Sequence, residues 1–583
     1  MKNHKQNRKN HGDKKVLQWI FKVSGKEKKN IVFLTLIQAF LGISSVIAAW
    51  FLRDVIDLAV AQDIEGFQRM VLAYVSVILL QIACRAAKRS LDEYTKSGLE
   101  NRFKERLFST LLNRDYARVS AVHSGEWMNR LTSDTVVVAD GLTTILPDMI
   151  GMGMRLLGAL GAILMIVPEL GFILLPGGLA LLFVSWAFRK RSKQLHKLVQ
   201  ETDGKLRVYL SDRLTSLLIV RSFAREKQIV SDAHQEMALH QKVRMKKNHF
   251  SNLCNTGFSV VMNGVYVAAV IYCGSGILHG TMSFGSFTAI LQLIGQVQSS
   301  FANITGYLPK FYTMLASAER LMEAESFAAV AQEEFWNTSD VQAFYKNDFA
   351  VMGLKDAAFT YQPIGEEENE KSSQPKVFSG LNLEIEKGDY VAFTGHSGCG
   401  KSTILKLLMS LYHLDEGSCY LKMQDGRETV LDERYVRLFA YVPQGNHLMS
   451  GTIREMVAFS DPQKMRDDAL IRKSLEIACA AEFVDTLADD VDTKLGERGM
   501  GLSEGQMQRI AIARAVCSGN PILILDEATS ALDDETEQRL LENLKNMTDK
   551  TVLIVTHRAA VLDICNRHVV MSEEGIEVRN HGN

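Results

Sequence analysis

The chain contains 583 residues, 47% of them hydrophobic and 23% charged, with 66 Lys and Arg against 67 Asp and Glu. Because a domain usually takes roughly 100 to 200 residues, this length argues against a single compact core. The net charge of −1 argues against a protein held on nucleic acid by a basic surface. With only 9 Pro and 41 Gly, the chain is neither collagen-like nor largely disordered.

Apolar stretches dominate the first 310 residues. A helix needs about 20 mainly apolar residues to cross a hydrocarbon core of about 30 Å, so the shorter stretches have to extend through their flanks. For the third helix, this extension includes residues 141–154 and places Asp148 and Arg155 inside it. We therefore predict an all-α domain of six membrane-spanning helices within residues 31–318. The six uncharged stretches are 31–51, 70–84, 156–168, 171–188, 250–279 and 281–309.

The basic residues predict how these helices are oriented, because short loops rich in Lys and Arg stay on the cytoplasmic side. The N-terminal segment 1–30 holds ten Lys and Arg, the segment 85–134 holds ten and the segment 189–248 holds fifteen. The other connections hold one at most. We therefore expect a multi-pass protein in the lipid bilayer of the cell membrane, bacterial in origin. Both termini and the two long helical loops would lie in the cytoplasm.

Two groups of polar residues interrupt the apolar helices. Asp148 and Arg155 are costly in lipid, so they either face a partner in a functional role or lie near an interface and extend to it. The sixth helix carries a polar surface that either lines a transport path or makes hydrogen bonds between helices. Its residues are Gln292, Gln296, Gln298, Ser299, Ser300 and Asn303.

The character of the sequence changes after Ala318. Residues 319–347 are acidic and mixed without a long apolar run, which predicts a linker. From residue 348 to 583, short apolar strands alternate with helical patterns, as expected for an α/β domain. The eight cysteines include no close pair of the kind that binds zinc or forms redox motifs, so we expect free thiols.

The strongest motif is a complete G-x-x-x-x-G-K-S pattern between a predicted strand at 390–393 and a predicted helix at 402–411. Its glycines let the backbone curl, so that N–H groups and the helix N-terminus surround a polyphosphate. We expect Lys401 to contact the β- and γ-phosphates of ATP and Ser402 to bind Mg²⁺. The predicted nucleotide-binding residues of this P-loop are Gly395, His396, Ser397, Gly398, Cys399, Gly400, Lys401, Ser402 and Thr403.

A second element of the same chemistry is the apolar strand 522–525, which ends in Asp526 and Glu527. In a P-loop NTPase, a buried strand that stops at an acid presents a carboxylate to the metal beside the phosphates. We expect Asp526 to hold the Mg²⁺ shell, and Glu527 to orient or deprotonate the attacking water. Alone, the pattern would suit a strand that ends at a solvated turn, but its pairing with the phosphate loop favours the catalytic interpretation.

Between these motifs stands Leu502-Ser503-Glu504-Gly505-Gln506, followed by a helix that carries arginines. This segment resembles the L-S-G-G-Q signature of the ATP-binding-cassette (ABC) transporters, with Glu504 in place of the first glycine of the pair. Further motifs match that family in the expected order. With the six preceding helices, they resemble an exporter-type (type IV) half-transporter over nearly the whole chain. These motifs are Tyr361, Gln444 in the segment 441–444, the D-loop segment 530–533 and His557.

The resemblance implies a role for each matching residue. Glu527, His557 and Gln444 would be catalytic, and Gln444 would also lie beside the Mg²⁺. Tyr361 would stack on the adenine of ATP. The residues that would close over the nucleotide of a second cassette are Ser503, Gly505, Gln506 and Asp533.

Because the signature would act on a second cassette, the resemblance implies that two chains are needed. The intact motifs favour a homodimer, with a heterodimer as the alternative. ATP bound between the cassettes would drive alternating access, and the segments 124–127 and 225–234 resemble the two coupling helices that dock on cassettes. We expect an ATP-driven exporter of an amphipathic small molecule, lipid or peptide. An importer of siderophores or cofactors and an ATP-gated regulator without pumping are the alternatives.

Cys399 supports a hypothesis that does not depend on the family. It stands inside the phosphate loop, close to Lys401 and to a helix N-terminus, conditions that raise the reactivity of a thiol. We expect alkylation of this thiol to block ATP hydrolysis and bound ATP to protect against it. An unreactive thiol is the alternative.

Overall fold

The computed structural model describes residues 13–122, 124–329, 337–361, 376–445, 448–496, 499, 501–547, 549–572 and 575–580. For residues 13, 170–190, 192, 193, 196, 304, 305, 308 and 580 it describes the backbone alone. The described residues form two compact units. The membrane unit contains residues up to 106 together with 129–322, and the cassette unit contains 107–128 together with residues from 323 onward.

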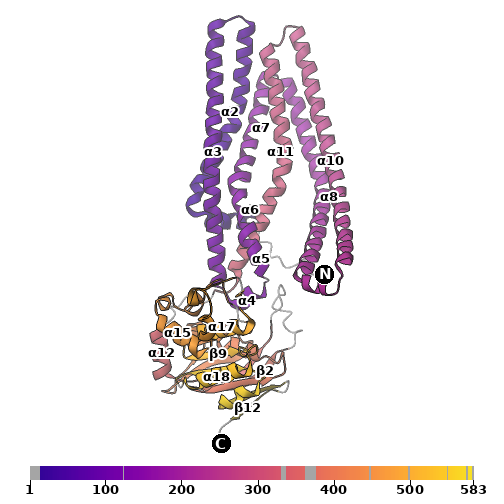
Figure 1. The fold of residues 1–583 in the computed structure, drawn as a ribbon. Coiled ribbons are helices and arrows are strands. Elements are labelled where there is room, and N and C mark those ends of the chain that lie inside the picture. Colours follow the sequence, from indigo (N-terminus) through magenta and orange to yellow (C-terminus); the bar gives the residue numbers. More distant parts are fainter. Residues whose placement is uncertain are drawn as a thin grey trace. The chain divides into compact units, whose positions relative to one another are not determined.

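The membrane unit is helical, as predicted. Among the residues that the structure describes, six helices are longer than 20 residues (Figure 1). The segments Lys14–Val60, Ile64–Leu112, Ser124–Ile166 and Glu226–Leu278 are long and apolar enough to cross a membrane. The six helices are α2 (Lys28–Val60), α3 (Ile64–Leu112), α7 (Leu146–Ile166), α8 (Pro168–Thr215), α10 (Glu226–Leu278) and α11 (Phe284–Glu323).

Shorter helices connect or precede these six. The third membrane helix is preceded by α- and π-helical segments that continue without a break from Ser124 to α7, in the part of the chain that was predicted as a long helical loop. The others are α1 (Asp13–Ser24), which precedes the first span, α4 (Tyr116–Ala121) after α3, and α9 (Leu217–Ser222) between α8 and α10. The upstream segments are α5 (Ser124–Asn129), η2 (Arg130–Asp134), α6 (Thr135–Asp140) and η3 (Gly141–Ile145).

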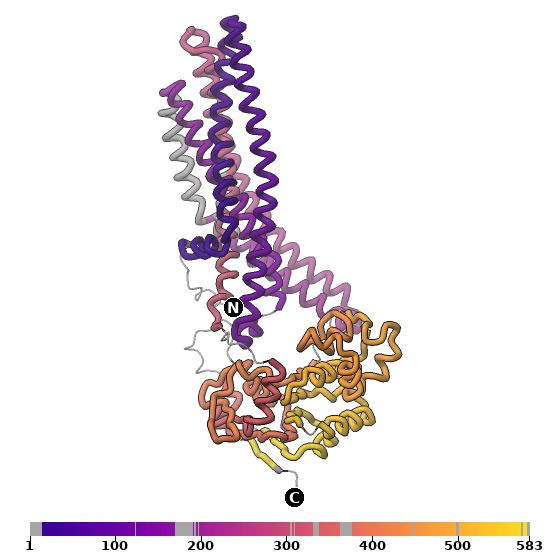
Figure 2. The backbone as a smooth tube through the Cα atoms, turned by 90° about the vertical axis from the view of Figure 1, so that its left-hand side faces the viewer, coloured from indigo at the N-terminus to yellow at the C-terminus, as the bar shows by residue number. Residues whose placement is uncertain are grey.

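Two glycines bring α2 and α7 into close contact. A Cβ atom on Gly42 would lie 2.5 Å from the carbonyl oxygen of Gly151, and one on Gly151 would lie 2.5 Å from Cγ of Gln38. Small residues at a crossing let two membrane helices approach closely. Further along both helices, Val46 and Ile163 join a buried apolar cluster with residues of α10 and α11. The helices α8 and α10 pack side by side (Figure 2).

The cassette unit is an α/β domain, as predicted, with two main sheets. A six-stranded sheet has the order β12-β11-β3-β10-β9-β6, in which β12 is antiparallel to β11 and the other pairs are parallel. An antiparallel sheet has the order β2-β1-β4-β5, and β7 pairs with β8. The strands are β1 (Phe349–Phe359), β2 (Phe378–Glu386), β3 (Tyr390–Gly395), β4 (Glu416–Met423), β5 (Glu428–Val430), β6 (Phe439–Val442), β7 (Gly451–Thr452), β8 (Lys494–Leu495), β9 (Ile522–Asp526), β10 (Thr551–Val555), β11 (Arg567–Ser572) and β12 (Gly575–Asn580).

Helices cover the six-stranded sheet, so its central strands are buried on both faces. Along β9, Ile522 and Ile524 join one apolar cluster while Leu523 and Leu525 join the other. This explains the unbroken apolar run in the sequence, because a parallel strand buried on both faces has no polar side. The helices of this unit are α12 (Thr338–Asn347), α13 (Lys401–Leu408), α14 (Ile453–Val457), α15 (Asp468–Ile477), α16 (Ala481–Val484), α17 (Glu504–Ser518) and α18 (Asp534–Lys545).

Part of the segment predicted as a linker contributes to the cassette core. In α12, Val341, Phe344 and Tyr345 are buried in the same cluster as β1. The ring of Tyr345 stacks on Phe349 with 5.2 Å between centroids, and its hydroxyl is 2.7 Å from the Thr551 Oγ1. Because α12 is only ten residues long, its apolar periodicity is too brief to be recognised in the sequence, and the segment was therefore predicted as a linker.

Candidate functional site

The predicted catalytic residues meet at one edge of the six-stranded sheet. The loops that leave the carboxyl ends of β3, β10, β9 and β6 are neighbours there, because these strands are adjacent and parallel. Ligands of open α/β sheets bind at this edge. The four loops carry the P-loop 395–403, His557, the Asp526–Glu527 pair and Gln444 in that order.

The P-loop has the backbone conformation that its glycines allow. Gly395, Gly398 and Gly400 have φ angles of 140°, 86° and 101°, in the region that favours glycine. A Cβ atom on Gly395 would lie 2.3 Å from the carbonyl oxygen of Met571, so no larger residue fits there. Gly400 is followed directly by the first residue of α13, which places the N-terminus of this helix at the loop.

Lys401 and Cys399 lie inside this loop. The Nζ of Lys401 donates hydrogen bonds to the carbonyl oxygens of Gly395 at 2.8 Å and His396 at 3.0 Å. The buried ammonium group is thus bonded to the backbone of the loop. In a nucleotide complex, a lysine at this position donates to phosphate oxygens instead. The Sγ of Cys399 lies 3.9 Å from the same Nζ, and the side chain is half-buried against the apolar core.

Asp526 connects the P-loop helix with the neighbouring strand. Its Oδ1 accepts a hydrogen bond from the Ser402 hydroxyl at 2.9 Å, and its Oδ2 accepts one from the Tyr441 hydroxyl at 3.1 Å. Burial raises the pKa of the Asp526 carboxyl, and the hydrogen bonds from Ser402 and Tyr441 oppose this shift. Tyr441 was not predicted as a site residue, because its position on β6 becomes informative only when β6 and β9 are seen to be neighbours.

Glu527 is held by the two other predicted catalytic residues. The amide nitrogen of Gln444 donates to its Oε2 at 2.7 Å, and the Nε2 of His557 lies 3.8 Å from its Oε1. Glu527 has a positive φ of 51°, an uncommon backbone conformation for a residue with a side chain and one that is found at functional sites. The structure therefore brings Gln444, Glu527 and His557 together although 113 positions separate the first and last.

Tyr361 follows β1, and its side chain lies against the first turn of α13. Its hydroxyl is 2.7 Å from the Thr403 Oγ1, and its ring packs edge-on against Phe359 at 5.1 Å and Tyr412 at 5.7 Å. The ring of Tyr412 in turn packs against Tyr116 of α4 at 6.1 Å. A row of aromatic rings therefore joins the predicted adenine-stacking residue to α4, a helix in the loop after α3.

This row is one contact between the loop after α3 and the cassette. It involves α4, and the segment predicted as a coupling helix, α5, begins three residues after α4 ends. Trp127 of α5 packs against Phe327, with 6.2 Å between ring centroids. Residues 107–128 belong to the cassette unit, and a coupling role for the segment 124–127 stays a prediction. The second predicted coupling segment, 225–234, begins α10 in the membrane unit and stays a prediction.

The signature segment forms the start of α17. Ser503 caps this helix in a reciprocal pair of hydrogen bonds with Gln506, and a Cβ atom on Gly505 would lie 2.8 Å from the carbonyl oxygen of Ala531. Glu504 occupies the first turn, where a carboxylate is favourable because the helix N-terminus is partially positive. Asp533 caps α18 by accepting from the Thr536 N–H at 2.9 Å, and this hydrogen bond is the first cause of its lowered pKa.

Two residues that were not predicted fix the D-loop. The buried Gln508 donates from its Nε2 to the Ser530 Oγ at 3.0 Å and accepts from the Ala531 N–H at 3.1 Å. Arg558, next to His557, donates to the carbonyl oxygen of Leu532 at 2.9 Å and forms an ion pair with the buried Glu537 at 2.8 Å. Both adjoin predicted motifs, which is the only signal that the sequence carries for them.

The site residues therefore fall into two groups within one chain. The P-loop, Tyr361, Gln444, Asp526, Glu527 and His557 form the first. In the described part of the chain, no hydrogen bond joins the signature residues to the P-loop. The second group, Ser503, Gly505, Gln506 and Asp533, is thus positioned as a separate surface by α17 and the D-loop.

Three of the polar residues predicted in the membrane unit, Asp148, Gln296 and Gln298, bind residues of neighbouring helices. Asp148 forms an ion pair with Lys88, with 2.7 Å between Oδ1 and Nζ, and accepts from the Tyr307 hydroxyl at 2.9 Å. On α11, the Nε2 of Gln296 donates to the carbonyl oxygen of Ser45 on α2 at 2.9 Å, and the Nε2 of Gln298 donates to that of Met262 on α10 at 2.7 Å. These two glutamines make the interhelical hydrogen bonds that were one of the two alternatives.

A membrane-spanning helical unit fused to a P-loop cassette with a signature helix defines a class of membrane ATPase, and two family models match it. The model described as ABC transporter transmembrane region matches residues 31–301, and the ABC transporter model matches residues 378–530. The chain belongs to the ABC transporters, in which the cassette hydrolyses ATP to drive transport, and it is a multi-pass, exporter-type half-transporter.

Individual relatives agree with this assignment. The chain is 26% identical over 571 residues to ABC transporter B family member 1 of Dictyostelium discoideum, which covers 96% of this chain but only 60% of that protein. It is 27% identical over 532 residues to the ATP-dependent lipid A-core flippase of Pasteurella multocida, which covers 88% and 87%. A solved structure of a bacterial Atm1-family ABC exporter with ATP bound matches with a TM-score of 0.79 over 95% of both chains. At 20% identity, this last similarity shows the fold.

Proposed function

We propose that two copies of this chain form an ATP-driven exporter in a bacterial cell membrane, with each ATP bound between the P-loop of one copy and the signature of the other. The separation of the two groups of site residues within one chain carries this proposal. Both groups contain every residue type that the chemistry needs, so a symmetric pair would hold two complete sites. A heterodimer with a different chain is the alternative.

The residues around the P-loop suit a magnesium nucleotide. In the described part of the chain, no cluster of three or more His, Cys, Asp or Glu could hold a metal by itself. The Ser402 hydroxyl and the Asp526 carboxylate are 2.9 Å apart, and both are the oxygen donors that Mg²⁺ prefers when phosphates and water complete its shell. With Gln444, they would hold Mg²⁺ beside the ATP phosphates, where the ion neutralises phosphate charge.

The chain's own residues then account for hydrolysis. Lys401 and the N-terminus of α13 bind the phosphates, and Tyr361 stacks on the adenine ring. Glu527 accepts a proton from the attacking water, a role for which Gln444 holds its carboxylate in place at 2.7 Å. The Nε2 of His557 lies near the other carboxylate oxygen of Glu527, at 3.8 Å from Oε1. His557 would stabilise the charge that develops on the γ-phosphate. Hydrolysis removes the contact between the two cassettes.

ATP binding between cassettes would drive alternating access of the membrane units. Moving a two-state equilibrium from 1:99 to 99:1 requires roughly 5.5 kcal/mol of differential binding, which a nucleotide shared by two surfaces can supply. The aromatic row from Tyr361 to α4 supports a path for this change to the first cytoplasmic loop. The similarity to a lipid flippase over most of both chains supports an amphipathic substrate.

A complementation experiment tests the shared sites. Two differently tagged chains allow mixed dimers to be purified. The first dimer carries Lys401→Ala in one chain and Ser503→Ala in the other. The second dimer carries both substitutions in the same chain, and its other chain is wild type. Shared sites predict ATP hydrolysis in the first dimer, which keeps one intact site, and none in the second. The reverse result would show that each chain forms its own site and would refute the proposal.

The direction of transport is tested in inside-out vesicles. ATP-dependent accumulation of a substrate indicates export, depletion of a preloaded substrate indicates the importer alternative, and ATP turnover without movement indicates a regulator. The control is Glu527→Gln, which we expect to lower turnover by about 100-fold or more while ATP still binds. The matched substitution Glu542→Gln, at an exposed position on α18, should leave turnover unchanged.

A further inference from the structure

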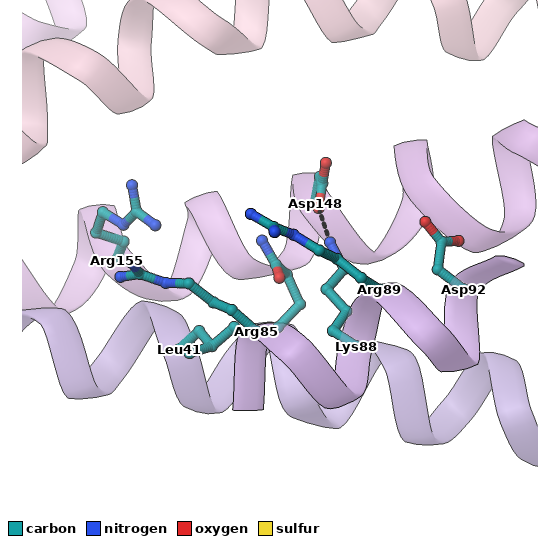
Figure 3. A pocket seen from close by; sticks show the side chains of 8 residues that line it. Leu41, Arg85, Lys88, Arg89, Asp92, Asp148 and Arg155 are labelled. Atoms are coloured by element: carbon teal, nitrogen blue, oxygen red, sulfur yellow. Dashed lines mark hydrogen bonds and ion pairs between the residues drawn. The ribbon is translucent and has the colours of Figure 1, made fainter. Parts of the chain in front are cut away.

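The membrane unit contains a polar pocket that the ATP chemistry does not use. It has a volume of about 280 Å³ and lies between α2, α3 and α7 (Figure 3). The pocket forms beside the crossing of α2 and α7 at Gly42 and Gly151, where the two backbones touch. Its lining residues are Gln38, Leu41, Arg85, Lys88, Arg89, Asp92, Asp148 and Arg155.

Positive charge exceeds negative charge in this lining. Four side chains are cationic and two are carboxylates. One cation, Lys88, is already paired with Asp148, whose second oxygen accepts from Tyr307. The Oδ2 of the other carboxylate, Asp92, accepts from the Thr144 hydroxyl at 3.4 Å.

The three arginines are left without a carboxylate partner. Within the described residues, no ion pair is found for Arg85, Arg89 or Arg155, and Arg85 donates only to its helical neighbour Gln81 at 3.3 Å. The buried Nε of Arg155 has no hydrogen-bond partner. Figure 3 shows the guanidinium groups of Arg85 and Arg155 close together, with the side chain of Arg89 extending toward them and Asp92 away from them. Buried polar groups without a partner are uncommon in proteins, and a bound anion is one explanation for such a group in a cationic pocket.

The depth of the pocket makes these charges costly. Gln38 lies seven residues into the apolar stretch that begins at Ile31, which corresponds to about 10 Å along a helix from the cytoplasmic end. Unpaired cations at such a depth are unfavourable in a bilayer. Arg85 and Arg89 are exposed on the surface of the chain, so a ligand can reach them. One turn beyond Arg155, Ala159 belongs to the apolar cluster of α2, α7, α10 and α11.

We propose that this pocket binds the phosphate or carboxylate group of an amphipathic anion, the molecule that the transporter moves. Guanidinium groups match the planar, bidentate geometry of such oxyanions. Among the described residues, none of the three arginines forms an ion pair with either carboxylate of the lining. The apolar part of the anion would extend from Arg155 toward the apolar cluster. The proposal rests on the proposed transport function for the fate of the ligand, but the binding itself needs no ATP.

Binding is measured on the full-length protein in phosphatidylcholine nanodiscs without nucleotide, by titration calorimetry. Dioctanoyl phosphatidic acid and dodecanoate are the anionic probes, and dioctanoylglycerol and dodecanol are their neutral counterparts with the same chains. Inorganic phosphate distinguishes a free anion from a lipid headgroup. We expect both amphipathic anions to bind and the neutral molecules to show no binding. Equal binding of anionic and neutral probes, or binding of none of them, would overturn the proposal.

Four variants test the role of the charges. Arg155→Gln should weaken binding by about tenfold or more, because a hydrogen bond to a charged group is lost. Arg155→Lys should lie between this variant and the wild type, since it keeps the charge but loses the planar fork. Asp148→Asn should tighten binding, because it removes a competing carboxylate. Arg69→Gln, exposed on the same helix as Arg85 and paired with Glu65, is the control and should not change binding.

The opposite effects of Arg155→Gln and Asp148→Asn separate a binding role from a structural one. If both variants weakened binding equally, the charges would serve packing alone and the proposal would fail. Thermal unfolding and elution volume check that each variant folds. If Asp148→Asn does not fold, the affinities of the position-155 variants decide between a binding and a structural role. A binding role predicts that affinity decreases from the wild type to Arg155→Lys to Arg155→Gln. Because the binding measurement uses no ATP, a negative transport assay would not affect the conclusion that the pocket binds anions. Likewise, absence of anion binding would not refute the proposed ATP-driven transport.

Discussion

Replacement of Tyr412 tests the aromatic row between the nucleotide site and α4 in the loop after α3. The Tyr412 ring contacts Tyr116 at 6.1 Å with an interplanar angle of 71°, an edge-to-face geometry worth about 0.5–1.5 kcal/mol. A hydrogen bond with Ser120 of α4 adds about 0.5–1.5 kcal/mol. Tyr412→Ala should therefore release α4 from the cassette by about 1–3 kcal/mol.

Hydrogen exchange of the α4 amides measures this release. A local loss of about 1–3 kcal/mol speeds exchange by about 5- to 150-fold when reclosing is faster than exchange, because the opening equilibrium then sets the rate. Tyr412→Phe is the matched control, because it keeps the ring and removes only the hydrogen bond, so its effect should be smaller. Apparent affinity for ATP should also fall in Tyr412→Ala, since Tyr361 loses its neighbour at 5.7 Å. Unchanged exchange of residues 116–121 in Tyr412→Ala would refute the reasoning.

Three other predictions concern the cassette. Gln508→Leu leaves the Ala531 N–H and the Ser530 hydroxyl without their partner, which costs about 1–3 kcal/mol. We therefore expect kcat for ATP hydrolysis to fall by a larger factor than KM rises. A change in KM alone would contradict a role of Gln508 in the D-loop. Iodoacetamide should inactivate the wild type, ATP should slow this, and Cys399→Ser should resist; equal sensitivity of Cys399→Ser would assign the effect to another thiol. Burial lowers the pKa of Lys550 from the ordinary lysine value of 10.5 to about 8. Between these two pH values the unfolded chain binds more protons than the folded one, so stability should rise with pH over that range. Lys550→Met should reduce the rise in melting temperature between pH 8 and 10, and an identical rise in both proteins would contradict this.

The sequence by itself determined the chemistry of the cassette. A P-loop, a strand ending in two acids and a helix cap at Ser503 are local patterns, and each is formed by residues close together in the chain. Local backbone rules therefore suffice to predict them, and the structure shows the expected glycine conformations at Gly395 and Gly400. The six long helices follow equally from runs of apolar residues that lipid requires.

Only the tertiary structure decided which distant residues meet. Gln444 and Glu527 are in contact because β6 and β9 are neighbours in a sheet whose order differs from the order of the sequence. Gln508 and Arg558 hold the D-loop through hydrogen bonds across loops, which no periodicity records. In the membrane unit, a glycine crossing of α2 and α7 places Arg155 beside residues of α3. Such contacts depend on how helices and strands pack against one another. The sequence pattern indicates whether a segment forms a helix or a strand, but it does not indicate which other segments will pack against it.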